Sequence, residues 1–230
     1  MFYYDSTYIL VAIGAILCMI ASSRVNSTFK KYSTVRSMSG LTGKEAAEKI
    51  LRHNGIFDVV VEHIPGNLTD HYDPRHKILR LSDATYNSTS VAAIGVAAHE
   101  CGHALQHASN YSPLTIRGAL VPIANFGSQL AWPLIIIGIF LNGNTGIMII
   151  NAGIICFSAA VIFQLVTLPV EFNASRRAVV QISEIGILGD DELSDTKKVL
   201  KAAAMTYVAS AAAGILQLLR LILIAKRNDD

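Results

Sequence analysis

The stretch His99-Glu-Cys-Gly-His-Ala-Leu-Gln-His107 is the most informative part of this 230-residue chain. It contains the pattern His-Glu-x-x-His within an apolar run that has no proline. On a helix, His99 and His103 are one turn apart and share a face. Two imidazoles at that spacing can bind one zinc ion, and Glu100 then lies beside the metal, where a general base for water is needed. The stretch therefore predicts a helix that carries a zinc site for peptide-bond hydrolysis.

A catalytic zinc site needs a third protein ligand and an open position for water. His107 continues the stripe of His99 and His103, but it lies about 5.4 Å farther along the helix. We therefore interpret His107 as a structural residue or as a partner that supports a ligand. Glu171 is the better candidate, and the alternative is an ordinary carboxylate paired with Arg176 or Arg177.

The composition indicates a membrane protein. Hydrophobic residues make up 52% of the chain and charged residues only 16%, whereas soluble domains carry about a quarter charged residues. The formal net charge of +2, with no basic patch interleaved with aromatics, argues against a nucleic-acid partner. The three cysteines are too few and too scattered for a disulfide framework and suit a reducing compartment.

Apolar runs at 6–23, 118–141 and 146–168 are each long enough to cross a bilayer. No basic residue precedes the first run, which argues against a cleaved signal peptide. Basic residues follow the first run and flank the other two, so the positive-inside rule places the N-terminus outside and the segment from residue 24 in the cytoplasm. The uncharged residues 142–145 are predicted to form a turn at the outer face.

A fourth apolar run covers residues 202–225 and contains Gln217 and Arg220. Its length favours a fourth span, although its basic end would then lie outside, and a helix along the membrane surface is the alternative. The small residues at 209–214 permit close helix packing within one chain or between chains. The sequence is therefore compatible with a homo-oligomer or with a membrane partner.

Residues 24–117 are predicted to form a compact α+β portion. Thr42-Gly-Lys-Glu45 has the pattern of a capping box, and Gly55 is expected to end the helix that it starts. Ser88 or Ser90 is expected to cap the motif helix, which ends at Ala108. Strands are predicted at 59–61 and 78–81, with a polar loop at 70–74 between them, and the 78–81 strand could offer an edge to an extended substrate.

The chain resembles the YugP-like neutral zinc metallopeptidases of bacterial membranes. The segments that carry this resemblance are Leu68-Thr-Asp-His-Tyr-Asp-Pro74, His99 to His107, the paired apolar runs, Leu168-Pro-Val-Glu171 and Ala174-Ser-Arg-Arg177. The chain is more distantly similar to HtpX-type membrane peptidases and CAAX prenyl proteases, which are gluzincins. This resemblance implies that zinc is bound by His99, His103 and Glu171, with Glu100 as the base.

One position departs from the gluzincin pattern. Many gluzincins have an aspartate four residues after the ligand glutamate, where it accepts a hydrogen bond from a zinc-binding histidine. Ser175 stands there in this chain, and its hydroxyl could support that histidine more weakly. Asn173 stands where close relatives are expected to have aspartate, and the sequence gives it no role.

We therefore expect a mainly α, multi-span membrane protein with a small α+β, zincin-like cytoplasmic catalytic portion. The expected segments are a span at 1–23, the zincin-like portion at 24–117, a transmembrane hairpin at 118–168, a cytoplasmic segment with the third zinc ligand at 169–201, and a fourth span with a tail at 202–230. Pro169 is expected to begin a new helix.

The expected function is that of a membrane-integrated zinc endopeptidase in the bacterial cytoplasmic membrane, with its active site facing the cytoplasm. Its substrates would be membrane or membrane-proximal proteins. The donor that stabilises the oxyanion is expected to be His71, with Tyr72, Arg176 and Tyr207 as other candidates, and a plain solvated turn is the alternative for 70–74. The alternative functions are a zinc-binding but inactive membrane scaffold, and a small transporter or channel component that uses the histidine cluster for metal passage.

Overall fold

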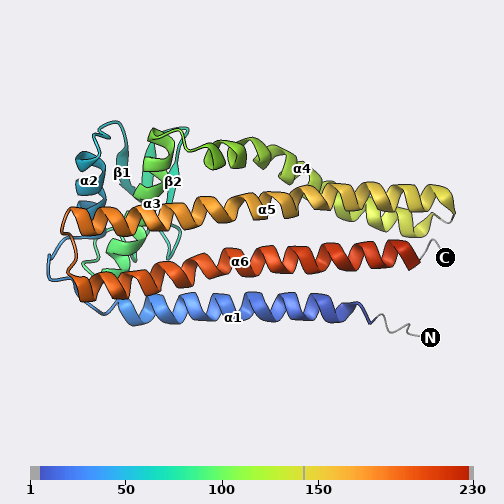
Figure 1. The fold of residues 1–230 in the computed structure, drawn as a ribbon, viewed down its shortest axis with the longest axis horizontal. Coiled ribbons are helices and arrows are strands. Elements are labelled where there is room, and N and C mark those ends of the chain that lie inside the picture. Colours follow the sequence, from blue (N-terminus) through green and yellow to red (C-terminus); the bar gives the residue numbers. More distant parts are fainter. Residues whose placement is uncertain (1–5, 142, 228–230) are drawn as a thin grey trace. The chain divides into compact units, whose positions relative to one another are not determined.

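The computed structural model describes residues 6–141 and 143–227. Its helices are α1 (Tyr8–Tyr32), α2 (Gly43–His53), α3 (Val91–Ala108), α4 (Ser112–Phe140), α5 (Asn144–Glu184) and α6 (Asp190–Arg227), and its strands are β1 (Val60–His63), β2 (His71–Asp73) and β3 (Ile78–Leu81) (Figure 1). The expected mainly α fold is confirmed. Residues 1–5, Asn142 and residues 228–230 lie outside the described residues, so the ends of the predicted 1–23 and 202–230 segments and the start of the 142–145 turn are not tested.

The chain divides into two compact units. The first, called the apolar unit here, comprises the described parts of residues 1–21, 115–168 and 206–230, and the second, called the α/β unit, comprises residues 22–114 and 169–205. All residues of the predicted zinc site belong to the α/β unit.

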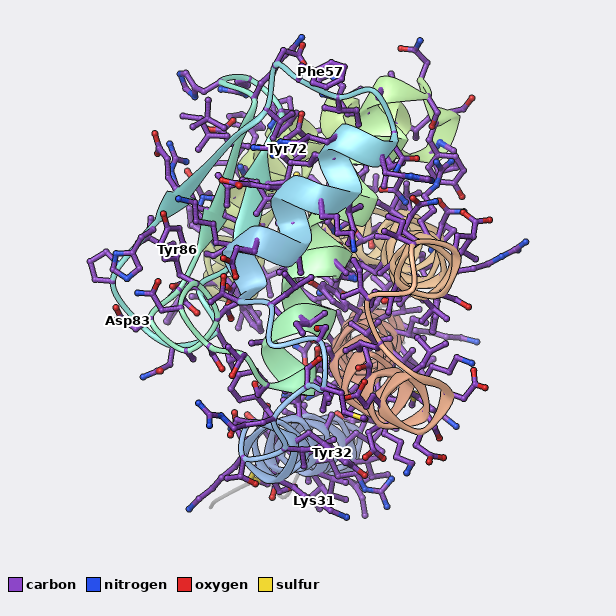
Figure 2. All side chains as sticks on the ribbon, turned by 90° about the vertical axis from the view of Figure 1, so that its left-hand side faces the viewer. Lys31, Tyr32, Phe57, Tyr72, Asp83 and Tyr86 are labelled. Carbon is purple, nitrogen blue, oxygen red and sulfur yellow. The ribbon has the colours of Figure 1, made fainter. Side chains whose placement is uncertain are left out.

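The α/β unit is built on a three-stranded sheet in the order β1-β3-β2. Strand β3 pairs in parallel with β1 and antiparallel with β2, so that Leu79 faces Val61 on one side and Tyr72 on the other. Helices α2 and α3 pack beside this sheet (Figure 2). Ile50, Leu79 and Ile94 are fully buried between them, and such burial stabilises each side chain by about 1.5–3 kcal/mol.

The predicted helix ends are present in this unit. The Thr42 hydroxyl accepts from the Glu45 backbone N–H at 3.2 Å, and the Glu45 carboxylate accepts from the Thr42 backbone N–H at 2.8 Å. Gly55 follows the end of α2 with a φ of +69°, a conformation that suits glycine. Of the two predicted caps of α3, Ser90 is the one used, because its hydroxyl accepts from the Ala93 N–H at 3.2 Å.

Two predictions about the sheet were wrong. The polar loop expected at 70–74 contains the strand β2, because Asp73 accepts from the backbone of Arg75 and His76 and turns the chain back onto β3. These polar residues do not show the alternating hydrophobicity that announces a strand. Strand β3 is central rather than an edge, so the outer strands of the sheet are β1 and β2.

Pro169 does not begin a new helix, contrary to expectation. Helix α5 runs without a break from Asn144 to Glu184 with Pro169 inside it. A proline inside a helix costs about 3 kcal/mol or more. The residues that follow it are deeply buried, with Val170 and Ala174 at 0% exposure and Glu171 at 2%, and their packing offsets this cost.

Helices α1, α4, α5 and α6 are each long and apolar enough to cross a membrane by length and composition. Within the apolar unit, the predicted small-residue run at 209–214 packs inside the chain. A side chain added at Gly14 would lie 3.1 Å from Ala213, and one added at Gly214 would lie 2.3 Å from the Gln164 amide oxygen. The small residues therefore bring α6 close to α1 and α5 in this unit.

Candidate metal centre

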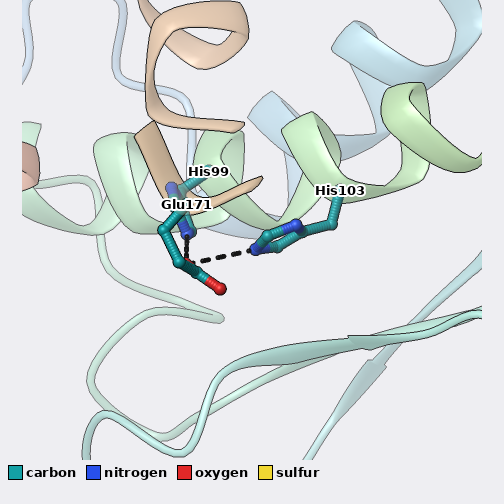
Figure 3. Close-up of side chains that lie close together, drawn as sticks. All are labelled: His99, His103 and Glu171. Atoms are coloured by element: carbon teal, nitrogen blue, oxygen red, sulfur yellow. Dashed lines mark ion pairs between the residues drawn. The ribbon is translucent and has the colours of Figure 1, made fainter. Parts of the chain in front are cut away.

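His99, His103 and Glu171 come together in the α/β unit, although Glu171 is far from both histidines in the sequence. One potential ligand atom from each lies within 4.8 Å of the others. The Nε2 atoms of His99 and His103 lie 3.3 Å and 3.6 Å from Oε2 of Glu171 (Figure 3). The three side chains thus direct two imidazole nitrogens and one carboxylate at a common point.

Close packing of α3 on α5 produces this arrangement. A β-carbon added at Gly102 would lie only 2.4 Å from the Ala174 carbonyl oxygen. Only glycine permits such an approach between two helix backbones. Gly102 precedes His103, and Ala174 follows Glu171 by less than one turn. This close approach therefore brings the candidate ligands of both helices together.

The Nδ1 atom of each histidine is held by a polar partner. Ser175 Oγ lies 3.0 Å from Nδ1 of His99, and Gln106 Oε1 lies 3.0 Å from Nδ1 of His103. Because the amide nitrogen of Gln106 donates to the Val170 carbonyl at 2.8 Å, its oxygen must accept, and Nδ1 of His103 therefore carries the proton. When His103 is neutral, with its proton on Nδ1, the Nε2 lone pair is available for a metal.

A line of hydrogen bonds leads from His103 to the surface. The amide nitrogen of Gln106 also donates to Oδ1 of Asn173 at 3.0 Å, and Nε of Arg177 donates to the same oxygen at 2.8 Å. The guanidinium of Arg177 lies over the Tyr111 ring at 5.7 Å. Asn173 therefore connects Arg177 to Gln106, the glutamine that holds the candidate ligand His103.

Opposite charges favour ionisation of the buried site. Burial raises the pKa of Glu171, but hydrogen bonds from His103 and His99 outweigh burial and hold the pKa well below its usual range. Burial lowers the pKa of His103, but Glu171 and the nearby Glu100 carboxylate outweigh it and raise the pKa. The two histidines thus favour the ionised form of the buried Glu171 carboxylate, and a buried negative charge suits a cation.

Glu100 and Cys101 differ sharply, although they are neighbours. Glu100 is 8% exposed, and it makes no hydrogen bond or ion pair within residues 6–141 and 143–227. The Cys101 thiol faces α2, with its sulfur 3.6 Å from the Ala47 carbonyl oxygen, and burial raises the pKa of this thiol. Cys101 is therefore a core residue, whereas the Glu100 carboxylate is available to react.

The remaining predicted residues lie elsewhere. The ring of His107 bonds through Nδ1 to the Tyr72 hydroxyl at 2.9 Å. The two ring nitrogens of His71 contact the Thr69 carbonyl at 2.9 Å and Arg80 at 3.3 Å rather than the three-residue cluster. Arg176 is exposed on α5, and Tyr207 belongs to the apolar unit.

Sequence reasoning missed Gln106. It is fully buried and lies three residues after His103 on the same helix. A polar residue at this spacing on an otherwise apolar helix is the signal that could have found it, because residues at i and i+3 are neighbours on a helix.

Comparison with known proteins confirms the family resemblance. A family profile described as "Putative neutral zinc metallopeptidase" matches residues 7–226. A relative from Bacillus subtilis (strain 168), named "Putative membrane protease YugP", is 48% identical over 224 residues, which cover 97% of this chain and 98% of the relative. No solved structure matches the chain.

Proposed function

Because this chain belongs to the family of neutral zinc metallopeptidases, we propose that it is a membrane-integrated zinc endopeptidase of the gluzincin type. Membership of the family implies a zinc cofactor and peptide substrates. In our proposal His99, His103 and Glu171 bind the zinc ion, and Glu100 is the general base.

The convergence of two Nε2 atoms and one carboxylate oxygen is the observation that carries this proposal. Imidazole nitrogen and carboxylate oxygen are the donors that zinc takes in catalytic sites. The fit is supported by the opposite ring nitrogens, which are already engaged by Ser175 and Gln106. Each imidazole is therefore oriented with the correct nitrogen toward the cluster.

When bound, zinc lowers the pKa of a water molecule and polarises the substrate carbonyl. The Glu100 carboxylate accepts a proton from the attacking water and passes it to the amine that leaves. Among the described residues it makes no hydrogen bond or ion pair, which suits this role, since an engaged carboxylate would first have to break such a contact. Ser175 and Gln106 keep the two imidazoles in place during this exchange.

We further propose that the chain crosses the membrane several times and that its site faces the cytoplasm. Four helices have the necessary length and apolarity, and the relative from Bacillus subtilis is named as a membrane protease. The basic residues that follow 6–23 and flank 118–168 favour a cytoplasmic α/β unit. In this arrangement the substrates are membrane or membrane-proximal proteins, and His71 stays the predicted donor to the oxyanion.

The test compares wild type with Glu100→Gln and Glu171→Ala, all purified in detergent. Bound zinc and cleavage of an unfolded protein are measured for each. Glu100→Gln should keep zinc and lose cleavage by a factor of about 10²–10⁴. Glu171→Ala should lose both zinc and cleavage, whereas Glu184→Gln, an exposed carboxylate on the same helix, should change neither.

Each outcome separates the alternatives. Wild-type turnover by Glu100→Gln would show that another group is the base. A full complement of zinc in Glu171→Ala would remove this carboxylate from the ligand set. Wild-type protein that holds zinc but cleaves no substrate would favour the inactive scaffold.

A further inference from the structure

A groove runs between α5 and α6 in the α/β unit. Its volume is about 290 Å³. Its apolar lining, called the floor here, consists of the side chains of Phe172, Val179, Val180, Leu200 and Ala204. Phe172 and Val180 are both more than 40% exposed. A volume near 300 Å³ is at the lower end of small-ligand sites, so the groove suits a small headgroup and the first part of an apolar chain.

Three cationic side chains line the same groove. They belong to Arg176 on α5 and to Lys197 and Lys201 on α6. All three are exposed, and none has an ion-pair or hydrogen-bond partner among the residues that the structure describes. No carboxylate lines the groove, and the acid Asp195 instead pairs with Lys198 at 2.8 Å.

The spacing of the groove residues along α5 and α6 explains this arrangement. Phe172, Arg176 and Val179 recur at spacings of four and three residues along α5. Along α6, Leu200 and Lys201 follow Lys197 by three and four residues. Residues at these spacings share one helix face. The apolar floor and the cationic rim are therefore presented together by two regular helices.

The groove residues are also close in sequence to apolar runs. Phe172 follows Leu168, the last residue of one run, by four positions, and Lys201 precedes the run at 202–225. Cations at such positions attract anionic lipid headgroups. An acidic peptide is less well matched, because the floor offers no strand edge to a peptide backbone.

We propose that this groove binds one anionic phospholipid, with the phosphate at Arg176, Lys197 and Lys201 and the start of an acyl chain on the apolar floor. Ser175 also lines the groove, and its hydroxyl contacts Nδ1 of His99 at 3.0 Å. The bound lipid would therefore adjoin the candidate metal centre. The proposal does not depend on peptidase activity, since it concerns lipid binding alone.

Native mass spectrometry of the full chain in neutral detergent tests the proposal, with phosphatidylglycerol and phosphatidylcholine as probes. Wild type should retain one phosphatidylglycerol in preference to phosphatidylcholine. A triple variant with Arg176→Gln, Lys197→Gln and Lys201→Gln should bind phosphatidylglycerol about a hundredfold more weakly, at roughly fivefold for each cation.

A charge-matched control keeps this result specific. Lys49→Gln, Arg52→Gln and Arg75→Gln remove the same charge from exposed positions of the α/β unit outside the groove, and this triple variant should bind the lipid as wild type does. Equal lipid binding by wild type and the groove variant would overturn the proposal. If the triple groove variant unfolds, Lys201→Gln alone should still show the fivefold loss.

One more variant and one competing ligand identify what the groove binds. Ala204→Phe should weaken lipid binding by filling the floor while leaving the cations in place. Inorganic phosphate should neither saturate the groove nor displace the lipid at equal concentration, because it cannot use the floor. Saturation by phosphate alone, or by an acidic peptide in place of the lipid, would overturn the proposal.

Discussion

The amide oxygen of Gln106 lies 3.0 Å from Nδ1 of His103, while the amide nitrogen of the same side chain donates to the Val170 carbonyl at 2.8 Å. One buried glutamine thus joins the helix of the two histidines to the turn of α5 that carries Glu171. Because Gln106 is fully buried, water cannot replace either contact without a rearrangement of the core.

Gln106→Ala should weaken zinc binding by about 10–100-fold, because His103 loses the acceptor that holds its tautomer. The variant should also lose about 1–3 kcal/mol of stability, since the buried hydrogen bonds of Gln106 to Val170 and Asn173 are lost. Competition with a chromophoric chelator measures the first effect, and thermal unfolding measures the second.

Gln181→Ala is the matched control for this variant. Gln181 is a partly buried glutamine of α5 that accepts from Asn54 and makes no contact with a candidate ligand. Its replacement should leave zinc affinity unchanged. Equal zinc affinity in Gln106→Ala and wild type would show that His103 does not need this support.

Replacement of Ser175 tests the departure from the gluzincin pattern. Ser175→Ala should reduce zinc affinity by up to about tenfold, because His99 loses its hydrogen-bond partner. Ser175→Asp should bind zinc at least as tightly as wild type, since a carboxylate is a stronger acceptor than a hydroxyl. Ser194→Ala, at an exposed position of α6, serves as the control in the same chelator competition. Weaker zinc binding by Ser175→Asp than by Ser175→Ala would contradict the support of His99 by residue 175.

Gly102→Ala should destabilise the fold by about 1–3 kcal/mol and release zinc, because the added methyl group would push α3 away from α5. The β-carbon of the new alanine would lie only 2.4 Å from the Ala174 carbonyl oxygen. Gly118→Ala is the control, since nothing lies within 4 Å of its added β-carbon in α4, and its stability should rise by up to about 1 kcal/mol. Thermal unfolding and zinc content would be measured together, and an unchanged zinc content in Gly102→Ala would refute the packing argument.

Alkaline titration should reveal Tyr72 as a late-ionising tyrosine. Burial raises the pKa of Tyr72 to about 12, and the charges of Asp58 and Asp73 act in the same direction. The native state favours the neutral phenol, so its contribution to stability is full below about pH 10 and is lost as the pH rises toward about 12. The ultraviolet absorbance of phenolate should show one late component, which Tyr72→Phe should remove. A titration that Tyr72→Phe leaves unaltered would assign the late component to another tyrosine.

The local elements of the fold were predictable because their signals lie within a few residues of one another. The capping box at Thr42 and Glu45 and the strand at 78–81 were both found from such signals. Strand β2 was not, because its pairing with β3 depends on a turn and on a partner strand rather than on its own polar residues. The continuation of α5 through Pro169 was missed for a similar reason, since local propensity argues for a break and only tertiary packing opposes it.

The residues of the candidate site divide in the same way, into those with a local sequence signal and those without one. His99, Glu100 and His103 were predicted from spacing alone, because a helix brings residues one turn apart onto one face. Glu171 needed the family resemblance, since no local pattern specifies which distant carboxylate joins two histidines. Gln106 and Asn173 were not given their roles, because their partners on α5 come into reach only through the approach of α3 to α5 at Gly102.

The distance in sequence between His103 and Glu171 bears on how the protein is made. A nascent chain that ends before residue 169 contains both histidines and Glu100, the proposed base, but it lacks Glu171, the Val170 carbonyl and Ser175. The apolar helices α4 and most of α5 are synthesised between the two halves of the cluster. The proposed proteolytic activity would therefore arise only after these helices have been translated. An incomplete chain in the cell would carry the His-Glu-x-x-His helix without the third candidate ligand.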